Sequence, residues 1–149
     1  MKYLDMVVSE TLRRYPFGPF LNRKCKEDYV IKETGFLIEK GTPILIPIDG
    51  IHNDPEYYPE PEKFEPNRFI DGIKQNSQSC TYLPFGMGPR NCIGDRFGLI
   101  CAKVGLTYFV KNFKVERCSE TPVPLTLNPK SPFMMPMRAL KMIVKKVDQ

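Results

Sequence analysis

The sequence has no tryptophan, one histidine (His52) and no Cys-x-x-Cys pair among its five cysteines. Structural zinc sites draw on clustered cysteine and histidine ligands, so this composition argues against a zinc centre. An odd number of cysteines without paired spacing also argues against a disulfide framework and fits a reducing, intracellular environment. With 149 residues and 42% hydrophobic residues, the chain has the size of one domain, which we predict to span residues 1–149.

Long apolar runs are absent as well. No stretch of eighteen apolar residues occurs and residues 1–10 do not form a signal peptide, so we expect the chain to carry no membrane anchor or secretory signal of its own. The net charge is +5, from 22 basic and 17 acidic residues. The basic residues are dispersed except near 141–146, which is typical of a solvated surface and predicts no nucleic-acid partner.

Residues 85–94 read Phe-Gly-Met-Gly-Pro-Arg-Asn-Cys-Ile-Gly and place Cys92 just before a stretch with helical periodicity that runs to about residue 112. Unpaired N–H groups and the helix dipole favour a thiolate at such a position, and Arg90 adds positive charge. Asn91 stands where a phosphate-binding GxGxxG loop needs glycine. Two interpretations of Cys92 remain, a small buried hydrophobic residue or a presented thiolate ligand.

Phe85, Gly88, Arg90, Cys92 and Gly94 fill the pattern Phe-x-x-Gly-x-Arg-x-Cys-x-Gly. This pattern resembles the haem-binding signature of the cytochrome P-450 family. The resemblance implies that the thiolate of Cys92 is the proximal ligand of the iron of haem b, where it donates electron density and favours cleavage of a bound O–O bond. The cofactor-binding residues that it implies in this stretch are Phe85, Gly86, Arg90, Cys92 and Gly94.

Residues 2–15 predict a helix that Pro16 ends. Glu10 and Arg13 share one face of it and, taken alone, indicate an ordinary surface ion pair. They also match the Glu-x-x-Arg helix signature of the same family, whose third member is the arginine of a Pro-x-Arg-Phe element, here Arg68. The family most often has glutamate where Asn67 stands. The resemblance implies that Glu10, Arg13 and Arg68 form a structural lock without a catalytic role.

Residues 17–25 predict an extended stretch, because Pro19 disfavours helix. In the family this segment passes over the haem face, and the resemblance implies that Arg23 pairs with a haem propionate. It also implies a substrate pocket, although plain core packing remains open for the phenylalanines. The implied substrate contacts are Phe17, Phe20 and Leu21, together with Phe133 and Met134 in a hairpin tip at 129–136.

The remaining elements complete an α+β prediction, the carboxy-terminal part of the cytochrome P-450 fold. Residues 29–31, 36–38 and 43–48 predict a β-meander with a turn at 33–35, and residues 54–66 a proline-rich connection. Residues 70–81 predict a polar surface loop, and residues 125–127 and 140–147 short strands, the last with one wet face. His52 has no identifiable nucleophile or carboxylate partner, which favours a structural role.

The resemblance covers only the carboxy-terminal part of the family, and no segment reads Gly-x-Glu/Asp-Thr-Thr. It implies a parent of the microsomal, xenobiotic-metabolising type, a monooxygenase that inserts one atom of dioxygen into lipophilic substrates. Electrons would come from an NADPH-dependent reductase or cytochrome b5 at a basic face that includes Arg90, Arg96, Lys103, Lys111 and Lys114. A missing amino-terminal anchor would hold the parent at the cytosolic face of the endoplasmic reticulum membrane.

For the chain alone we expect no turnover and weak or absent haem retention. Two alternatives stay open. The parent could be a haem-thiolate isomerase or dehydratase that needs no reductase, or the chain could be an inert truncated product.

Overall fold

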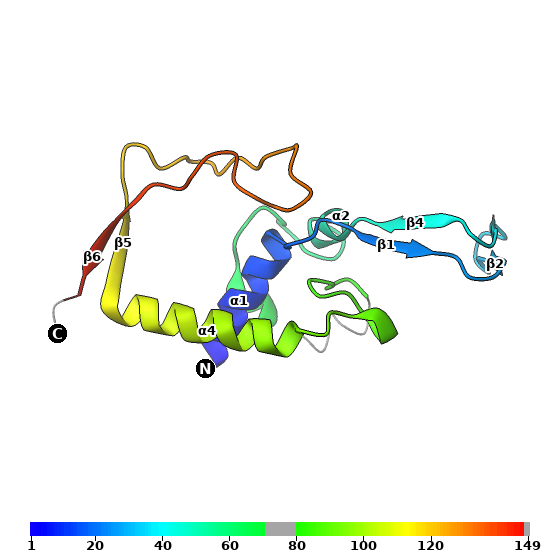
Figure 1. The fold of residues 1–149 in the computed structure, drawn as a ribbon, viewed down its shortest axis with the longest axis horizontal. Helices are drawn as coiled ribbons and strands as arrows, with labels where there is room; N and C mark the ends of the chain where they lie inside the picture. The colour runs from blue at the N-terminus through cyan, green and yellow to red at the C-terminus, as the bar shows by residue number, and fades with distance from the viewer. Residues whose placement is uncertain (71–79, 148–149) are drawn as a thin grey trace.

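The computed structural model describes residues 1–70 and 80–147, so the loop predicted at 70–81 falls almost wholly outside the described residues. Two long helices and three separate two-stranded antiparallel sheets give an α+β architecture, as predicted (Figure 1). The helices are α1 (Lys2–Arg14), α2 (Ile48–His52) and α4 (Asp95–Asn112), with the short 3-10 helices η1 (Pro66–Phe69) and η2 (Gly88–Arg90). The strands are β1 (Leu21–Lys24), β2 (Tyr29–Val30), β3 (Leu37–Ile38), β4 (Pro43–Ile46), β5 (Phe113–Arg117) and β6 (Met142–Lys146).

Helix α1 lies at the centre of the molecule (Figure 1) and contributes the buried residues Met6, Val8, Ser9, Glu10 and Arg13. It ends at Arg14, where the Tyr15 amide donates to the carbonyl of Thr11 and Pro16 offers no N–H to continue the ladder. Its buried face packs on η1, and Met6, Phe69 and Tyr82 form the apolar cluster between them. Because Glu10 and Arg13 share that face, the helix also buries two opposite charges.

Residues 21–46 form one long antiparallel hairpin that projects from the body of the molecule (Figure 1). Strand β1 pairs with β4, and β2 pairs with β3 nearer the tip, which turns at Gly35 with φ +69°. The predicted three-stranded meander is therefore wrong, because β3 and β4 are consecutive parts of one arm and not neighbours. Backbone hydrogen bonds between Cys25 and the 41–42 segment carry the pairing across the gap between the two ladders.

The strand predicted for residues 43–48 ends early, at Ile46. Pro47 has no N–H for the ladder and instead occupies the N-cap position of α2. Ile48 is consequently a buried helix residue, only 2% exposed. The short helix α2, which the sequence did not predict, places His52 beneath α1 and starts the proline-rich connection to η1.

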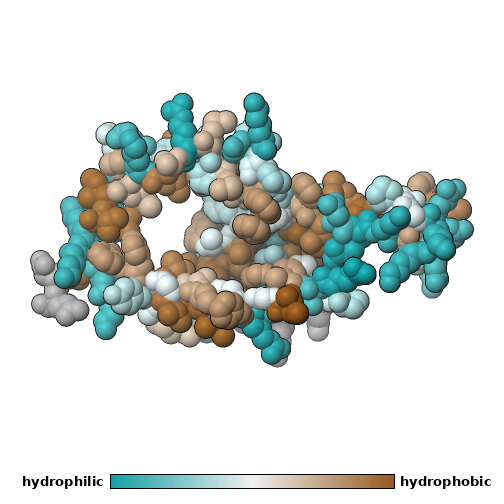
Figure 2. Space-filling model, viewed as in Figure 1, coloured by the Kyte–Doolittle hydropathy of each residue, from teal (hydrophilic) through white to brown (hydrophobic). Residues whose placement is uncertain are grey.

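Helix α4 begins after Gly94 and follows its predicted range, but none of its residues is buried against the described part of the chain. Its apolar side chains, among them Phe97 and Tyr108, stay largely exposed. Figure 2 shows an opening bounded by α4, the β5–β6 ladder and the segment that joins those strands. In the described residues no helix combines the length and the apolarity needed to cross a membrane.

The end of the chain differs from prediction in two ways. Residues 113–117 form β5, an unpredicted strand that follows α4 directly and pairs with β6. Residues 125–127 form no strand, and only Leu127 makes a bridge, to Pro136. Strand β6 lies within the predicted range 140–147, but all five of its residues are exposed, so no dry face is formed among the described residues.

Candidate functional site

Cys92 lies in the loop between the buried residue Leu83 and the start of α4. Three backbone hydrogen bonds shape this loop, from Gly86 N to Leu83 O at 3.0 Å, from Asn91 N to Gly88 O at 3.1 Å and from Cys92 N to Phe85 O at 2.8 Å. Gly86 and Gly88 adopt φ values of +74° and +81°, a region that side chains disfavour. The Cys92 thiol is exposed and makes no hydrogen bond within the described residues. The loop therefore presents the thiol to its surroundings, against the buried-hydrophobe alternative.

The Cys92 loop packs against strand β1, although the two segments are far apart in the sequence. A Cβ atom added at Gly86 would lie 3.6 Å from Leu21 Cδ1 and 3.8 Å from Arg23 Nη2. Glycine is favoured here by its left-handed backbone, with φ +74°, whereas a Cβ atom would make only ordinary van der Waals contacts with the strand. The structure thus brings Gly86 and Leu21, and with them Arg23, into one place.

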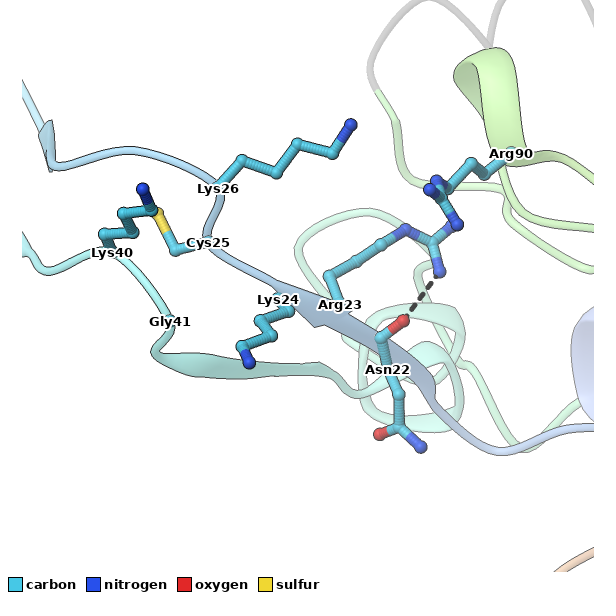
Figure 3. A pocket seen from close by; sticks show the side chains of 8 residues that line it. All are labelled: Asn22, Arg23, Lys24, Cys25, Lys26, Lys40, Gly41 and Arg90. Carbon is cyan, nitrogen blue, oxygen red and sulfur yellow. Dashed lines mark hydrogen bonds between the residues drawn. The ribbon is translucent and has the colours of Figure 1, made fainter.

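An open pocket of about 790 Å³ lies between β1 and the Cys92 loop (Figure 3). Five of its eight lining residues are cationic and none is acidic: Asn22, Arg23, Lys24, Cys25, Lys26, Lys40, Gly41 and Arg90. The guanidinium groups of Arg23 and Arg90 point toward one another in Figure 3, and Arg23 Nη1 donates to Asn22 O at 2.9 Å. Facing cations without a carboxylate between them favour an anionic ligand.

Glu10 and Arg13 form a buried two-pronged ion pair, with both side chains fully buried. Arg13 Nε donates to Glu10 Oε2 at 2.8 Å and Arg13 Nη2 donates to Oε1 at 2.9 Å. The remaining guanidinium hydrogens reach the carbonyls of His52 at 2.6 Å and Pro61 at 2.7 Å. One arginine therefore ties α1 to α2 and to the proline-rich connection.

Arg68 joins this cluster more loosely than Arg13. Its Nε lies 3.6 Å from Glu10 Oε1, too far for a hydrogen bond, and has no other partner within the described residues. Its Nη2 donates to Glu60 O at 2.9 Å, while the Glu65 amide donates to Glu10 Oε1 at 2.9 Å. The structure brings all three predicted lock residues together, with Arg13 as the tight partner and Arg68 as an ion contact.

His52 is fully buried between α1 and the residues that lead into the Cys92 loop. Its Nδ1 lies 3.2 Å from Arg13 O, and its Nε2 accepts from the Leu83 amide at 2.8 Å. The ring stacks on Tyr82, whose hydroxyl donates to Ser9 O at 3.0 Å. The sequence indicated only a structural histidine, and no local signal could show that its partner is an amide 31 residues away.

Burial lowers the pKa of His52 from 6.5 to about 4, and the nearby Arg13 charge also lowers it, although the hydrogen bond to Arg13 O raises it. The other titratable groups around the ring are Tyr58 and Tyr82, whose pKa values are raised by burial. At neutral pH all three are therefore uncharged in the folded protein.

This pKa predicts acid sensitivity. His52 has a pKa of 6.5 in the unfolded protein and about 4 in the folded protein, so between these pH values only the unfolded state binds the proton. Folding stability therefore falls as the pH falls from 6.5 to about 4. We expect a loss of about 2 to 3 kcal/mol between pH 7 and pH 4.5. Urea unfolding at several pH values measures it. His52→Gln should remove that part of the slope; an unchanged slope in this variant would assign it to carboxylates.

The sequence model of the cytochrome P450 family matches residues 1–144. The chain is 49% identical over 131 residues to cytochrome P450 6k1 of Blattella germanica, which covers 88% of this chain and 25% of the relative. It is 46% identical over 149 residues to probable cytochrome P450 6a23 of Drosophila melanogaster and 48% identical over 149 residues to cytochrome P450 3A13 of Mus musculus. Those alignments cover 100% of this chain and 30% and 29% of the relatives.

The chain belongs to the cytochrome P450 family. It spans between 25% and 30% of the length of these three relatives. Cytochromes P450 bind haem b through a cysteine thiolate. Haem b offers an iron for a thiolate and two propionate carboxylates for cations. The presented thiol of Cys92 and the facing guanidiniums of Arg23 and Arg90 supply both kinds of partner, so the residues of this P450 chain fit the cofactor.

The residues predicted to contact substrate fall into two groups in this P450 chain. Phe17 and Phe133 stack with ring centroids 4.5 Å apart, and the Met134 amide donates to Phe17 O at 3.2 Å. The structure thus joins the segment after α1 to the hairpin tip near the chain end. Phe20 is exposed just before β1, and Leu21 is half-buried on β1 beside Gly86. 

Two of the five residues of the predicted basic face have acidic neighbours in this P450 chain. Lys103 forms an ion pair with Asp5 of α1, and its hydrogen bond lowers the pKa of that carboxyl. Lys114 lies 3.8 Å from Glu116. Arg90, Arg96 and Lys111 make no ion pair within residues 1–70 and 80–147. These three remain as the charges that an acidic partner would meet.

Proposed function

We propose that residues 1–149 are the carboxy-terminal part of a haem-thiolate monooxygenase domain and that Cys92 is the iron ligand. The observation that carries this proposal is the exposed Cys92 thiol, held by a glycine-turned loop beside the cationic pocket of Arg23 and Arg90. Membership of the P450 family supports the thiolate chemistry. The elements then have family roles: α1 as the Glu-x-x-Arg helix, α4 as the proximal helix and β5–β6 as the terminal hairpin.

The bound haem supplies dioxygen activation, in which one oxygen atom enters an apolar substrate and the electrons come from a reductase. The residues of the chain hold the haem and offer a surface to the substrate. Cys92 would hold the iron through its thiolate, and Arg23 and Arg90 would pair with the propionates. Phe85, Gly86 and Gly94 let the loop approach the macrocycle. The stacked Phe17 and Phe133 offer an apolar surface to a lipophilic substrate.

The exposed apolar face of α4 supports the view that other segments of the complete protein complete the domain. Phe97 is 74% and Val104 64% exposed although both are apolar, which is typical of a surface that another part of a protein covers. The relatives are more than three times as long as the chain, so the matching parts exist in the family. In the complete protein an amino-terminal anchor places the domain on the cytosolic face of the endoplasmic reticulum.

Electron donors dock on the side of α4 in this proposal. Arg96 and Lys111 meet an acidic surface of an NADPH-dependent reductase or of cytochrome b5, because Arg90 is assigned to the propionates. The pairing of Lys103 with Asp5 removes that lysine from the docking set.

The carbon monoxide difference spectrum of the reduced protein tests the proposal. We expect a thiolate-type band from the complete protein and little or none from residues 1–149 alone, because the chain leaves the haem pocket open. The complete protein with its reductase should oxidise an apolar substrate at the expense of NADPH. A thiolate band without NADPH-dependent oxidation would favour an isomerase or dehydratase. A stable band and turnover from the chain alone would contradict its assignment as a part of the domain.

A further inference from the structure

We infer that His52 is a positioning residue for the Cys92 loop: its neutral ring holds the Leu83 amide and so fixes how the loop presents the thiolate. This inference rests on the proposed function, because positioning matters only if Cys92 binds iron. His52 itself touches neither the cofactor pocket nor Cys92 and acts through the backbone.

Hydrogen bonds and the chain itself link the ring to the cysteine, with each amide donating back toward the ring. His52 Nε2 accepts from Leu83 N at 2.8 Å, and Leu83 O accepts from Gly86 N at 3.0 Å. Phe85, between these two residues in sequence, accepts through its carbonyl from Cys92 N at 2.8 Å. The ring therefore anchors the amino-terminal side of the same turn that holds the Cys92 amide.

The opposite side of the ring is attached to the lock on α1. Because a carbonyl oxygen only accepts, the 3.2 Å contact with Arg13 O assigns the proton to Nδ1 and leaves Nε2 free to accept from Leu83. The same arginine holds Glu10 with its side chain. A histidine in this tautomer thus couples the most deeply buried ion pair of the chain to the turn before the cysteine.

The surroundings leave the ring little freedom to take another position. It is 0% exposed and stacks on Tyr82 with centroids 5.5 Å apart. Tyr58 packs against its edge at 6.3 Å and donates its hydroxyl to Thr81 O at 3.0 Å. A buried amide such as that of Leu83, left without an acceptor, is costly, so the turn would shift to find another partner.

Two substitutions separate the two sides of the ring. The amide of asparagine lies where Nδ1 lies, so His52→Asn keeps a donor for Arg13 O and loses the acceptor for Leu83. The carbonyl oxygen of glutamine reaches the place of Nε2, so His52→Gln keeps that acceptor. Tyr58→Phe is the matched control, because it removes a hydrogen bond from the same buried cluster without touching the Leu83 amide.

The readouts are the ratio of thiolate-ligated to thiolate-free haem in the carbon monoxide difference spectrum of the complete protein, and the hydrogen-exchange rate of the Leu83 amide. In His52→Asn we expect the ratio to fall and the exchange to accelerate, each by about tenfold, which is the effect of losing one buried hydrogen bond. His52→Gln and Tyr58→Phe should keep both values near those of the parent.

Each outcome decides the role of His52. A lower thiolate-ligated fraction and faster Leu83 exchange in a folded His52→Asn protein, with retention of both values in His52→Gln, support the inference. A His52→Asn protein that fails to fold shows a purely structural role and overturns it. Equal loss in both variants, no loss in either, or an equal loss in Tyr58→Phe overturns it. If the proposed function itself is wrong, the unsubstituted complete protein gives no thiolate band at all, which distinguishes that outcome from a failure of the inference about His52.

Discussion

Replacing Cys92 with serine should abolish the thiolate-type spectrum and all oxygenation in the complete protein. A serine hydroxyl is a poor substitute for a thiolate, because the thiolate's electron donation to iron is what favours O–O cleavage. The rest of the loop would stay as it is, since the Cys92 amide, not its side chain, bonds to Phe85 O at 2.8 Å. The measurements are the carbon monoxide difference spectrum, haem content and NADPH-dependent turnover.

Cys101→Ser is the matched control for this prediction. Cys101 is another exposed free cysteine, located within α4 and away from the glycine-turned loop. Its replacement should leave the thiolate band and turnover unchanged, because it is not in the position of the ligand. A Cys92→Ser protein that kept both would show that another residue binds the iron.

Local sequence signals predicted the parts of this P450 chain that depend on neighbours in sequence. Helix α1 ends before Pro16 and α4 starts after Gly94, as capping and proline rules suggest. The turn at Gly35 also falls in the predicted place. The loop around Cys92 could be recognised because its motif specifies five positions within ten residues.

Long-range pairing could not be read from the same signals. Strand β4 has the apolar residues of a meander strand, yet it pairs with β1 because the chain doubles back as a single hairpin. β5 was missed because it follows α4 without a turn residue between them. Arg68 was predicted as the third member of the lock, but whether its Nε reaches Glu10 depends on side-chain angles that no motif encodes.

The cationic pocket shows how such distant pieces make a site. Arg23 comes from β1 and Arg90 from η2, and neither alone indicates an anion site. They meet because the loop at Gly86 packs against Leu21. The family resemblance marked both residues for the same cofactor, while only the fold supplies the reason that they face one pocket.

Arg13→Ala should cost about 3 to 5 kcal/mol of folding stability, the usual effect of leaving one member of a buried ion pair without its partner. The Glu10 carboxylate would keep only the Glu65 amide and the distant Arg68, and the carbonyls of His52 and Pro61 would lose their donors. Total stability is typically about 5–15 kcal/mol, so the loss is a large fraction. Urea unfolding, the yield of folded protein and its haem content measure it.

A smaller change at the same position separates charge from geometry. Arg13→Lys keeps the positive charge but replaces the planar guanidinium with a single ammonium, which cannot reach two carboxylate oxygens and two carbonyls at once. We therefore expect this variant to show most of the stability loss of Arg13→Ala. Arg14→Ala is the matched control, since its half-buried side chain donates only to Asn53 Oδ1 and should cost about 1 kcal/mol. Because the lock lies away from the Cys92 thiol, the Arg13 variants should lose folded haem protein before they change any chemistry. A fully folded variant with altered oxygenation would show that the lock assignment is wrong.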